Sequence, residues 1–159
     1  MNALAFIRES ADYFVAAKAI DDEIGDDRGY EILSPKACYY NAFHSLELAA
    51  KAVLVNAGYT EKQLKTVSHS LSQAIGEARK SGLALLLTPE EERLVGLLDR
   101  YYLRLRYPES GEIELPVWGA LTDLLVKVLK ATIQAVPGGE AAIRPEVIDR
   151  LSGFVSWHA

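Results

Sequence analysis

Apolar residues recur every three or four positions through most of the chain, which is the spacing of an amphipathic helix. No segment alternates apolar and polar residues as a half-buried strand does. Because the connections are short, consecutive helices are expected to be antiparallel neighbours. The pattern predicts an all-α fold, an antiparallel helical bundle of about five helices, with helices near 3–22, 34–58, 71–81, 89–106 and 117–136 and a short last one near 145–154.

Capping residues predict several helix ends. Ser34 is a favourable N-cap and Pro35 suits the first helical position of the helix at 34–58. Thr88 and Pro89 have the same two roles at the start of the helix at 89–106. Gly58 is suited to the position just after a helix, where the backbone turns left-handed. Between helices, Thr60 is expected to cap a short helical turn, EKQLK.

The helix at 34–58 is apolar almost all round, so it is expected at the centre of the bundle. It keeps His44, Glu47 and Lys51 at positions i, i+3 and i+7, which lie on one helical face. Two interpretations are open. The three residues form either a local ion pair beside a histidine at the edge of the core, or the lining of a functional pocket.

The helix at 89–106 combines an apolar stripe with a basic one and stops before Pro108, which cannot continue it. The predicted buried stripe is Leu94, Leu97, Leu98, Tyr101 and Leu105. The predicted polar face carries Arg93, Arg100 and Arg104, with Arg106 close behind and Tyr101, Tyr102 and Tyr107 interleaved.

These arginines are either a solvated face or a surface for nucleic acid. Charge stripes on helices usually just face water. Arginine forks, however, match phosphate oxygens, and aromatic rings stack on bases. His69, at an expected helix start in VSHSL, is also ambiguous: it satisfies helix-terminal backbone groups, or it acts as an acid or base near neutral pH.

Composition narrows the function. With 159 residues, half of them hydrophobic, the chain is expected to form one domain over 1–159. Its net charge of −5 disfavours a general polyanion binder but leaves room for a local basic groove. The single cysteine, Cys38, lies in the apolar helix and is expected to be a buried core residue.

Targeting and cofactor signals are missing from the sequence. The N-terminal segment MNALAFIRESADYF does not have the pattern of a signal peptide, and no run of about 18 uncharged apolar residues occurs that would span a membrane, so a cytoplasmic protein without a membrane partner is expected. No His or Cys group has metal-ligand spacing, and no glycine-rich phosphate loop occurs. We therefore expect no metal site, no cofactor and no catalytic residue.

Three segments, in order, resemble the HEPN family of helical domains: YYNAFHSLELAAKAVLVNAG, VSHSL and LLDRYYLRLRYPES. The resemblance covers about Ser34 to Ser110 and implies an antiparallel bundle that dimerises, with a polar groove near the interface. It implies a cytoplasmic role in nucleotide or RNA handling, often beside a minimal nucleotidyltransferase in a toxin–antitoxin pair. Ribonuclease members carry an arginine, four to six residues and then a histidine.

The chain departs from that ribonuclease pattern. After Arg100, Arg104 and Arg106 no histidine follows until His158. The departure favours a non-ribonuclease member, a homodimeric binding module for a nucleotide, RNA or protein partner. Its candidate ligand-binding residues are His44, Lys51, His69, Arg100, Arg104 and Arg106. The alternative is a degenerate ribonuclease toxin that pairs Arg104 or Arg106 with His69; a third possibility is a structural dimer without a ligand.

Overall fold

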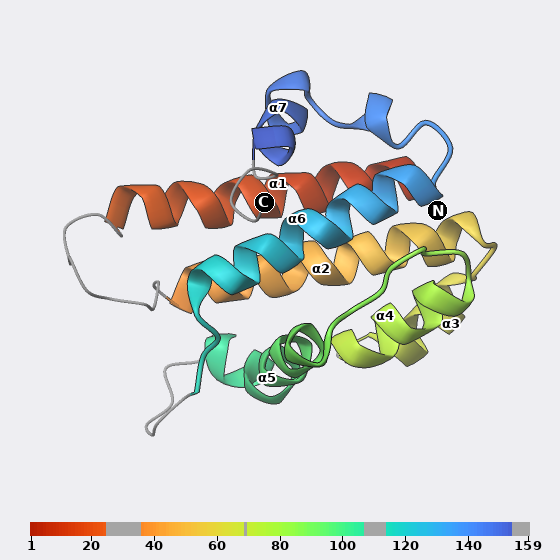
Figure 1. Cartoon of the computed structure of the whole chain (residues 1–159). Coiled ribbons are helices and arrows are strands. Elements are labelled where there is room, and N and C mark those ends of the chain that lie inside the picture. Colours follow the sequence, from red (N-terminus) through yellow and green to blue (C-terminus); the bar gives the residue numbers. More distant parts are fainter. Residues whose placement is uncertain (25–35, 69, 107–113, 154–159) are drawn as a thin grey trace.

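The computed structural model describes residues 1–24, 36–68, 70–106 and 114–153. These residues form α-helices and a 3₁₀-helix and contain no strand, so the predicted all-α class is confirmed (Figure 1). Of the described α-helices, five have ten or more residues and two are shorter, in agreement with a prediction of about five. The elements are α1 (Ala3–Ile24), α2 (Lys36–Asn56), α3 (Glu61–Val67), α4 (Leu71–Lys80), α5 (Pro89–Arg106), α6 (Trp118–Ala135), η2 (Glu140–Ala142) and α7 (Pro145–Gly153).

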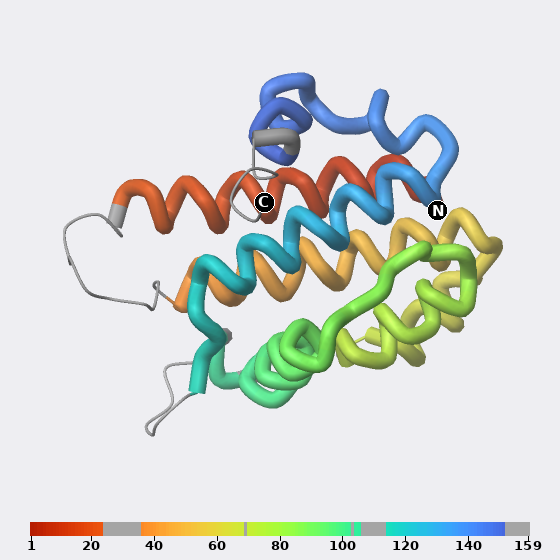
Figure 2. The backbone as a smooth tube through the Cα atoms, viewed as in Figure 1, coloured from red at the N-terminus to blue at the C-terminus, as the bar shows by residue number. Residues whose placement is uncertain are grey.

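Three long helices form the centre of the fold. α1 and α2 run antiparallel and pack along their length, and α6 lies across both, in the same direction as α2 (Figure 2). α4 and α5 pack against α2 on the side away from α1, while η2 and α7 lie beyond α1 (Figure 1). α2 therefore contacts helices from both sides of the molecule.

The central position of α2 agrees with its apolar sequence. Its fully buried residues include Tyr39, Phe43, Leu46 and Leu54, and Cys38 is buried as expected. Burial raises the pKa of the Cys38 thiol to about 11, so the side chain stays a neutral core group. Burying apolar surface of this kind is the main source of stability of a helical bundle.

Local capping chemistry sets several helix ends as predicted. Thr60 and Gln63 form reciprocal side-chain to backbone hydrogen bonds at the start of α3. Thr88 and Glu91 do the same at the start of α5, with the Glu91 carboxylate 2.7 Å from the Thr88 nitrogen. Gly58 has a φ of +90°, a left-handed conformation that glycine adopts without strain.

One buried position on α5 differs from the prediction. Tyr102 is 5% exposed and belongs to the core, whereas Tyr101, predicted to be in the buried stripe, is only half-buried. Tyr102 stacks on Phe43 with ring centroids 4.0 Å apart, so it is unavailable for stacking on a base. The predicted N-terminal cap of α2 and the predicted stop after α5 lie outside the described residues.

Candidate functional site

Glu47 joins the polar residues predicted on α2 into one unit. Its carboxylate lies 2.8 Å from Nζ of Lys51 and 3.5 Å from Nδ1 of His44. All three side chains are largely covered: 8% exposed for Glu47, 15% for Lys51 and 17% for His44. The helical spacing thus places a buried acid between a lysine and a histidine, as the sequence indicated.

The environment of Glu47 keeps it ionised. Burial alone raises the pKa of a carboxyl group. Here hydrogen bonds from His44 and Lys51, together with their charges, outweigh burial and lower the pKa of Glu47 to about 2. The Glu47 carboxylate therefore neutralises much of the positive charge that Lys51 would otherwise present to a ligand.

His44 is surrounded by aromatic rings from three helices. Its imidazole lies 4.5 Å from the ring of Tyr40, 5.2 Å from that of Tyr13 on α1 and 5.8 Å from that of Tyr102 on α5, measured between centroids. Its Nε2 atom is buried and has no hydrogen-bond partner among the described residues. His44 thus faces the aromatic core, and the inward position of Nε2 favours the interpretation of a histidine at the edge of the core.

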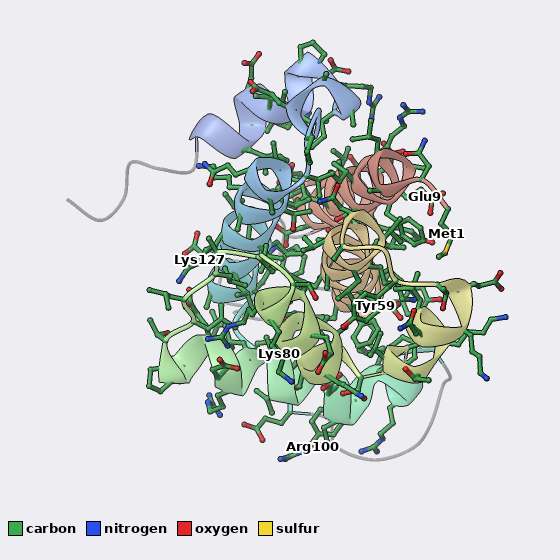
Figure 3. The ribbon with its side chains drawn as sticks, turned by 90° about the vertical axis from the view of Figure 1, so that its right-hand side faces the viewer. Met1, Glu9, Tyr59, Lys80, Arg100 and Lys127 are labelled. Carbon is green, nitrogen blue, oxygen red and sulfur yellow. The ribbon has the colours of Figure 1, made fainter. Side chains whose placement is uncertain are left out.

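The arginines of α5 differ in what surrounds them. Arg93 is held by Glu90 and Glu114, at 3.3 and 3.2 Å. Arg100 is exposed and makes no ion pair within the part of the chain that the structure describes, and Figure 3 shows it pointing away from the other helices. Arg104 is half-buried, with its guanidinium carbon 5.8 Å from the centre of the Tyr101 ring.

The predicted site residues therefore fall on two surfaces. Residues i and i+2 of an α-helix point in directions about 200° apart. Arg100 and Arg104 are each two residues from Tyr102, the residue of α5 that contacts His44, so both point away from it. His44 and Lys51 belong to the α2 cluster, and Arg100 and Arg104 to the outer face of α5. His69 and the side chain of Arg106 lie outside the described residues.

A profile of the HEPN domain matches residues 33–133, about two thirds of the chain. The chain belongs to the HEPN family. The match runs from the start of α2 into α6 and so extends beyond the 34–110 segment that carries the sequence resemblance. Comparison of the HEPN chain with curated proteins and with solved structures gave no significant match. α1, η2 and α7 lie outside the matched HEPN region.

Asp99 is a structural residue of this HEPN domain that sequence reasoning missed. Its carboxylate on α5 accepts hydrogen bonds from the backbone N–H groups of Leu71 and Ser72, the latter at 2.9 Å, and from the Ser70 hydroxyl. It thereby caps the N-terminus of α4 from another helix. A negative charge at this end also interacts favourably with the helix dipole. In the sequence, Asp99 is simply an acid next to the arginines of this helix, and nothing nearby indicates its partner.

The aromatic residues around His44 were also missed. Tyr40 precedes His44 by one helical turn, a signal that the sequence contains. Tyr13 and Tyr102 come from distant segments, so their contact with His44 is visible only in the tertiary structure.

Among the described residues, no group of three His, Cys, Asp or Glu side chains is placed to hold a metal ion. None of the described helices is long and apolar enough to cross a bilayer.

Proposed function

We propose that this HEPN chain is a non-catalytic binding module that holds a nucleotide or an RNA end on the outer face of α5, and that it acts as a homodimer. The proposal assigns ligand contact to Arg100, Tyr101 and Arg104. Lys51 and His44 are assigned to the support of α2 against α1 and α5, because Glu47 neutralises one and the aromatic rings enclose the other.

The observation that carries the proposal is the difference between Arg93 and Arg100 on the same helix. Arg93 is occupied by two carboxylates, whereas Arg100 is exposed without an acidic partner among the described residues. An arginine fork donates two parallel hydrogen bonds to a phosphate. The nearby pair of Tyr101 and Arg104 offers an aromatic face and a second guanidinium, which suit a base and its phosphate.

The net charge of the chain limits the size of such a contact. With 22 acidic and 17 basic side chains, a long polyanion would be repelled over much of the surface. A mononucleotide or the end of an RNA strand contacts a small area and avoids this repulsion. The proposal therefore predicts that the chain contacts only a few nucleotides of its ligand.

Calorimetric titration with mono- and oligonucleotides at two salt concentrations tests the proposal. Arg100→Ala is expected to weaken binding about tenfold and to reduce its salt dependence, because one phosphate contact is lost. Arg93→Ala is the matched control, an exposed arginine on the same helix whose charge is already compensated. Equal losses in both variants, or no binding by the wild type, would refute the nucleotide proposal.

Sedimentation equilibrium tests the homodimer. Leu86, in the connection before α5, is 84% exposed, and we assign it to the dimer interface, where a partner chain would remove this apolar side chain from water. A dimer at micromolar concentration that dissociates on Leu86→Ser is expected. A wild-type monomer under these conditions would contradict this part of the proposal.

A further inference from the structure

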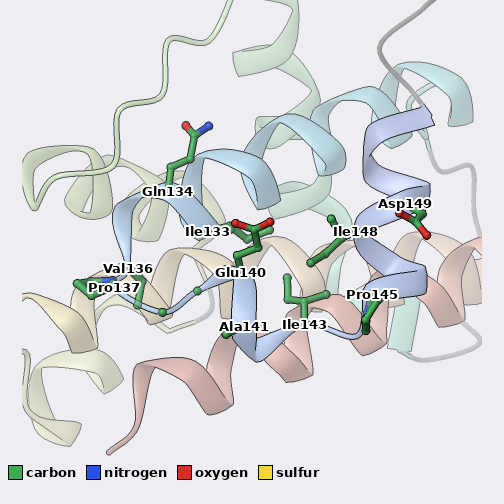
Figure 4. A pocket seen from close by; sticks show the side chains of 12 residues that line it. Ile133, Gln134, Val136, Pro137, Glu140, Ala141, Ile143, Pro145, Ile148 and Asp149 are labelled. Atoms are coloured by element: carbon green, nitrogen blue, oxygen red, sulfur yellow. The ribbon is translucent and has the colours of Figure 1, made fainter.

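A groove of about 910 Å³ lies between the end of α6 and the segment that carries η2 and α7 (Figure 4). Ile133 and Val136 line it from the α6 side, and Ile143 and Ile148 from the other. Its volume is at the upper end of typical ligand sites, roughly 300–1,000 Å³, but its exposed rim leaves it open to solvent. An open apolar groove of this size suits side chains of a polypeptide better than a small molecule, which binds best where the site encloses it.

Two glycines hold the groove in shape. Gly138 has a φ of +76°, and a Cβ added to Gly139 would lie 2.6 Å from the carbonyl oxygen of Ile133. The chain therefore turns back directly against the last turn of α6. The Gly139 N–H donates to the Val136 carbonyl at 2.9 Å, which closes this turn. The groove is thus formed by backbone geometry before any ligand arrives.

The charged residues that line the groove are both acidic. Glu140 and Asp149 line it and are exposed, and no lysine or arginine is among its lining residues. In the view of Figure 4, Ile143 and Ile148 lie between these two acids. Arg144 is close in sequence, but its guanidinium pairs with Asp12 on α1 and with Glu146. Such a rim repels phosphate and attracts cations, so the groove is chemically unlike the α5 surface.

A second copy of this chain fits the groove poorly. The large apolar side chains exposed on the described surface are Met1, Leu86 and Val117. Neither the segment from 82 to 88 nor that from 114 to 118 contains a lysine or arginine to meet the acidic rim, and the segment that follows Met1 carries a single one, Arg8, for two acids. Every lining residue except Ile133 lies beyond the matched HEPN region, so the groove is almost entirely outside that region.

We propose that this groove is a docking site for a short segment of a partner protein in which leucine- or isoleucine-type side chains are flanked by lysine or arginine. The apolar side chains would enter between α6 and α7, and the cationic groups would meet Glu140 and Asp149. This interaction is independent of nucleotide binding on α5.

A synthetic peptide of alternating leucine and lysine, labelled with fluorescein, is the probe, and the same peptide with glutamate in place of lysine is the charge control. Anisotropy is expected to show binding of the leucine–lysine peptide to the full chain. The double variant Glu140→Lys with Asp149→Lys, and separately Ile148→Ser, should each weaken that binding about tenfold. Circular dichroism verifies that both variants remain folded.

The matched control is Glu23→Lys with Asp123→Lys, which changes the net charge equally at two exposed acids that do not line the groove. Retained binding in this control, with loss in the groove variants, supports the proposal. Equal weakening in both double variants would mean general charge attraction and overturn it, as would no binding by the wild type. A self-associated chain that Ile148→Ser makes monomeric would assign the groove to a second copy and also overturn it.

Discussion

Ser10 of α1 and Ser45 of α2 each donate a hydrogen bond to the other's backbone carbonyl, at 2.7 and 2.8 Å. Both side chains are fully buried. The two bonds require the helix backbones to approach closely, which small side chains at the crossing permit. This crossing fixes how far along α1 the Tyr13 ring lies, and Tyr13 is one of the rings around His44.

Ser45→Ala is expected to lower the free energy of unfolding by about 1 kcal/mol, the net contribution of a hydrogen bond. Ser45→Leu should cost more, because a larger side chain must push two close-packed helices apart. Urea unfolding measures both, with the exposed Ser72→Ala on α4 as a near-neutral control. A Ser45→Leu protein as stable as the wild type would contradict the close crossing.

The buried Glu47 should make the fold sensitive to acid. Its folded pKa of about 2 lies below that of an unfolded glutamate, roughly 4.3, so ionised Glu47 stabilises the fold above that pH. The contribution, of order 3 kcal/mol, is lost as the pH falls from about 4.3 towards 2. Glu47→Gln should be less stable near neutrality, since it leaves Lys51 without its partner, and should lose less stability on acidification.

Chemical unfolding of the wild type and Glu47→Gln between neutral pH and about pH 3 measures this difference. Glu61→Gln is the matched control, because Glu61 and Lys65 have the same spacing but are 72% and 73% exposed. Its stability should be indistinguishable from that of the wild type, as for most exposed ion pairs. Parallel acid curves for wild type and Glu47→Gln would refute the prediction.

Asp99→Ala should destabilise the protein by about 1–2 kcal/mol, since three hydrogen bonds at the start of α4 lose their acceptor. The effect should be local as well as global. Hydrogen exchange at the Leu71 and Ser72 amides is expected to accelerate more than exchange in α2. The exposed Asp123→Ala on α6 serves as the control. Unchanged exchange at both amides would show that Asp99 is not the cap.

The sequence predicts those parts of the fold that depend on neighbouring residues. Thr60, Thr88 and Gly58 act on atoms within a few positions, so the helix ends that they form could be located from the sequence. The unit of His44, Glu47 and Lys51 could be located for the same reason, because one helix carries all three.

Contacts between distant segments were beyond such reasoning. Asp99 caps a residue 27 positions earlier, and nothing in its own helix indicates that partner. The pairing of Arg93 with Glu114 is of the same kind. It distinguishes Arg93 from Arg100, which has no acidic partner among the described residues. Periodicity alone also cannot choose between adjacent aromatic residues at the edge of a stripe, which is why Tyr101 was expected where Tyr102 is buried.

The purified chain is expected not to cleave RNA. The resemblance to ribonuclease members fails at the histidine expected after the arginine of α5, and that histidine would supply proton transfer. Incubation with end-labelled RNA, with and without metal ions, measures cleavage. Activity that disappears in His69→Ala would establish the degenerate ribonuclease instead of the binding module.

Gly139→Ala should be among the more damaging single-methyl additions in this chain. The added Cβ would meet the carbonyl oxygens of Ile133 and Val136 at 2.6 and 2.9 Å, and both belong to the backbone, which cannot rotate away as a side chain does. We expect the free energy of unfolding to fall by about 1–3 kcal/mol, as for overpacking.

Gly119→Ala is the matched control, because no atom lies within 4 Å of its added Cβ and the residue is in α6. There, alanine should stabilise the helix by up to about 1 kcal/mol. Thermal unfolding should therefore shift in opposite directions for the two variants. A Gly139→Ala protein that unfolds at or above the wild-type temperature would show that the turn after α6 is looser than described, and that the groove beside it is not held open by the backbone.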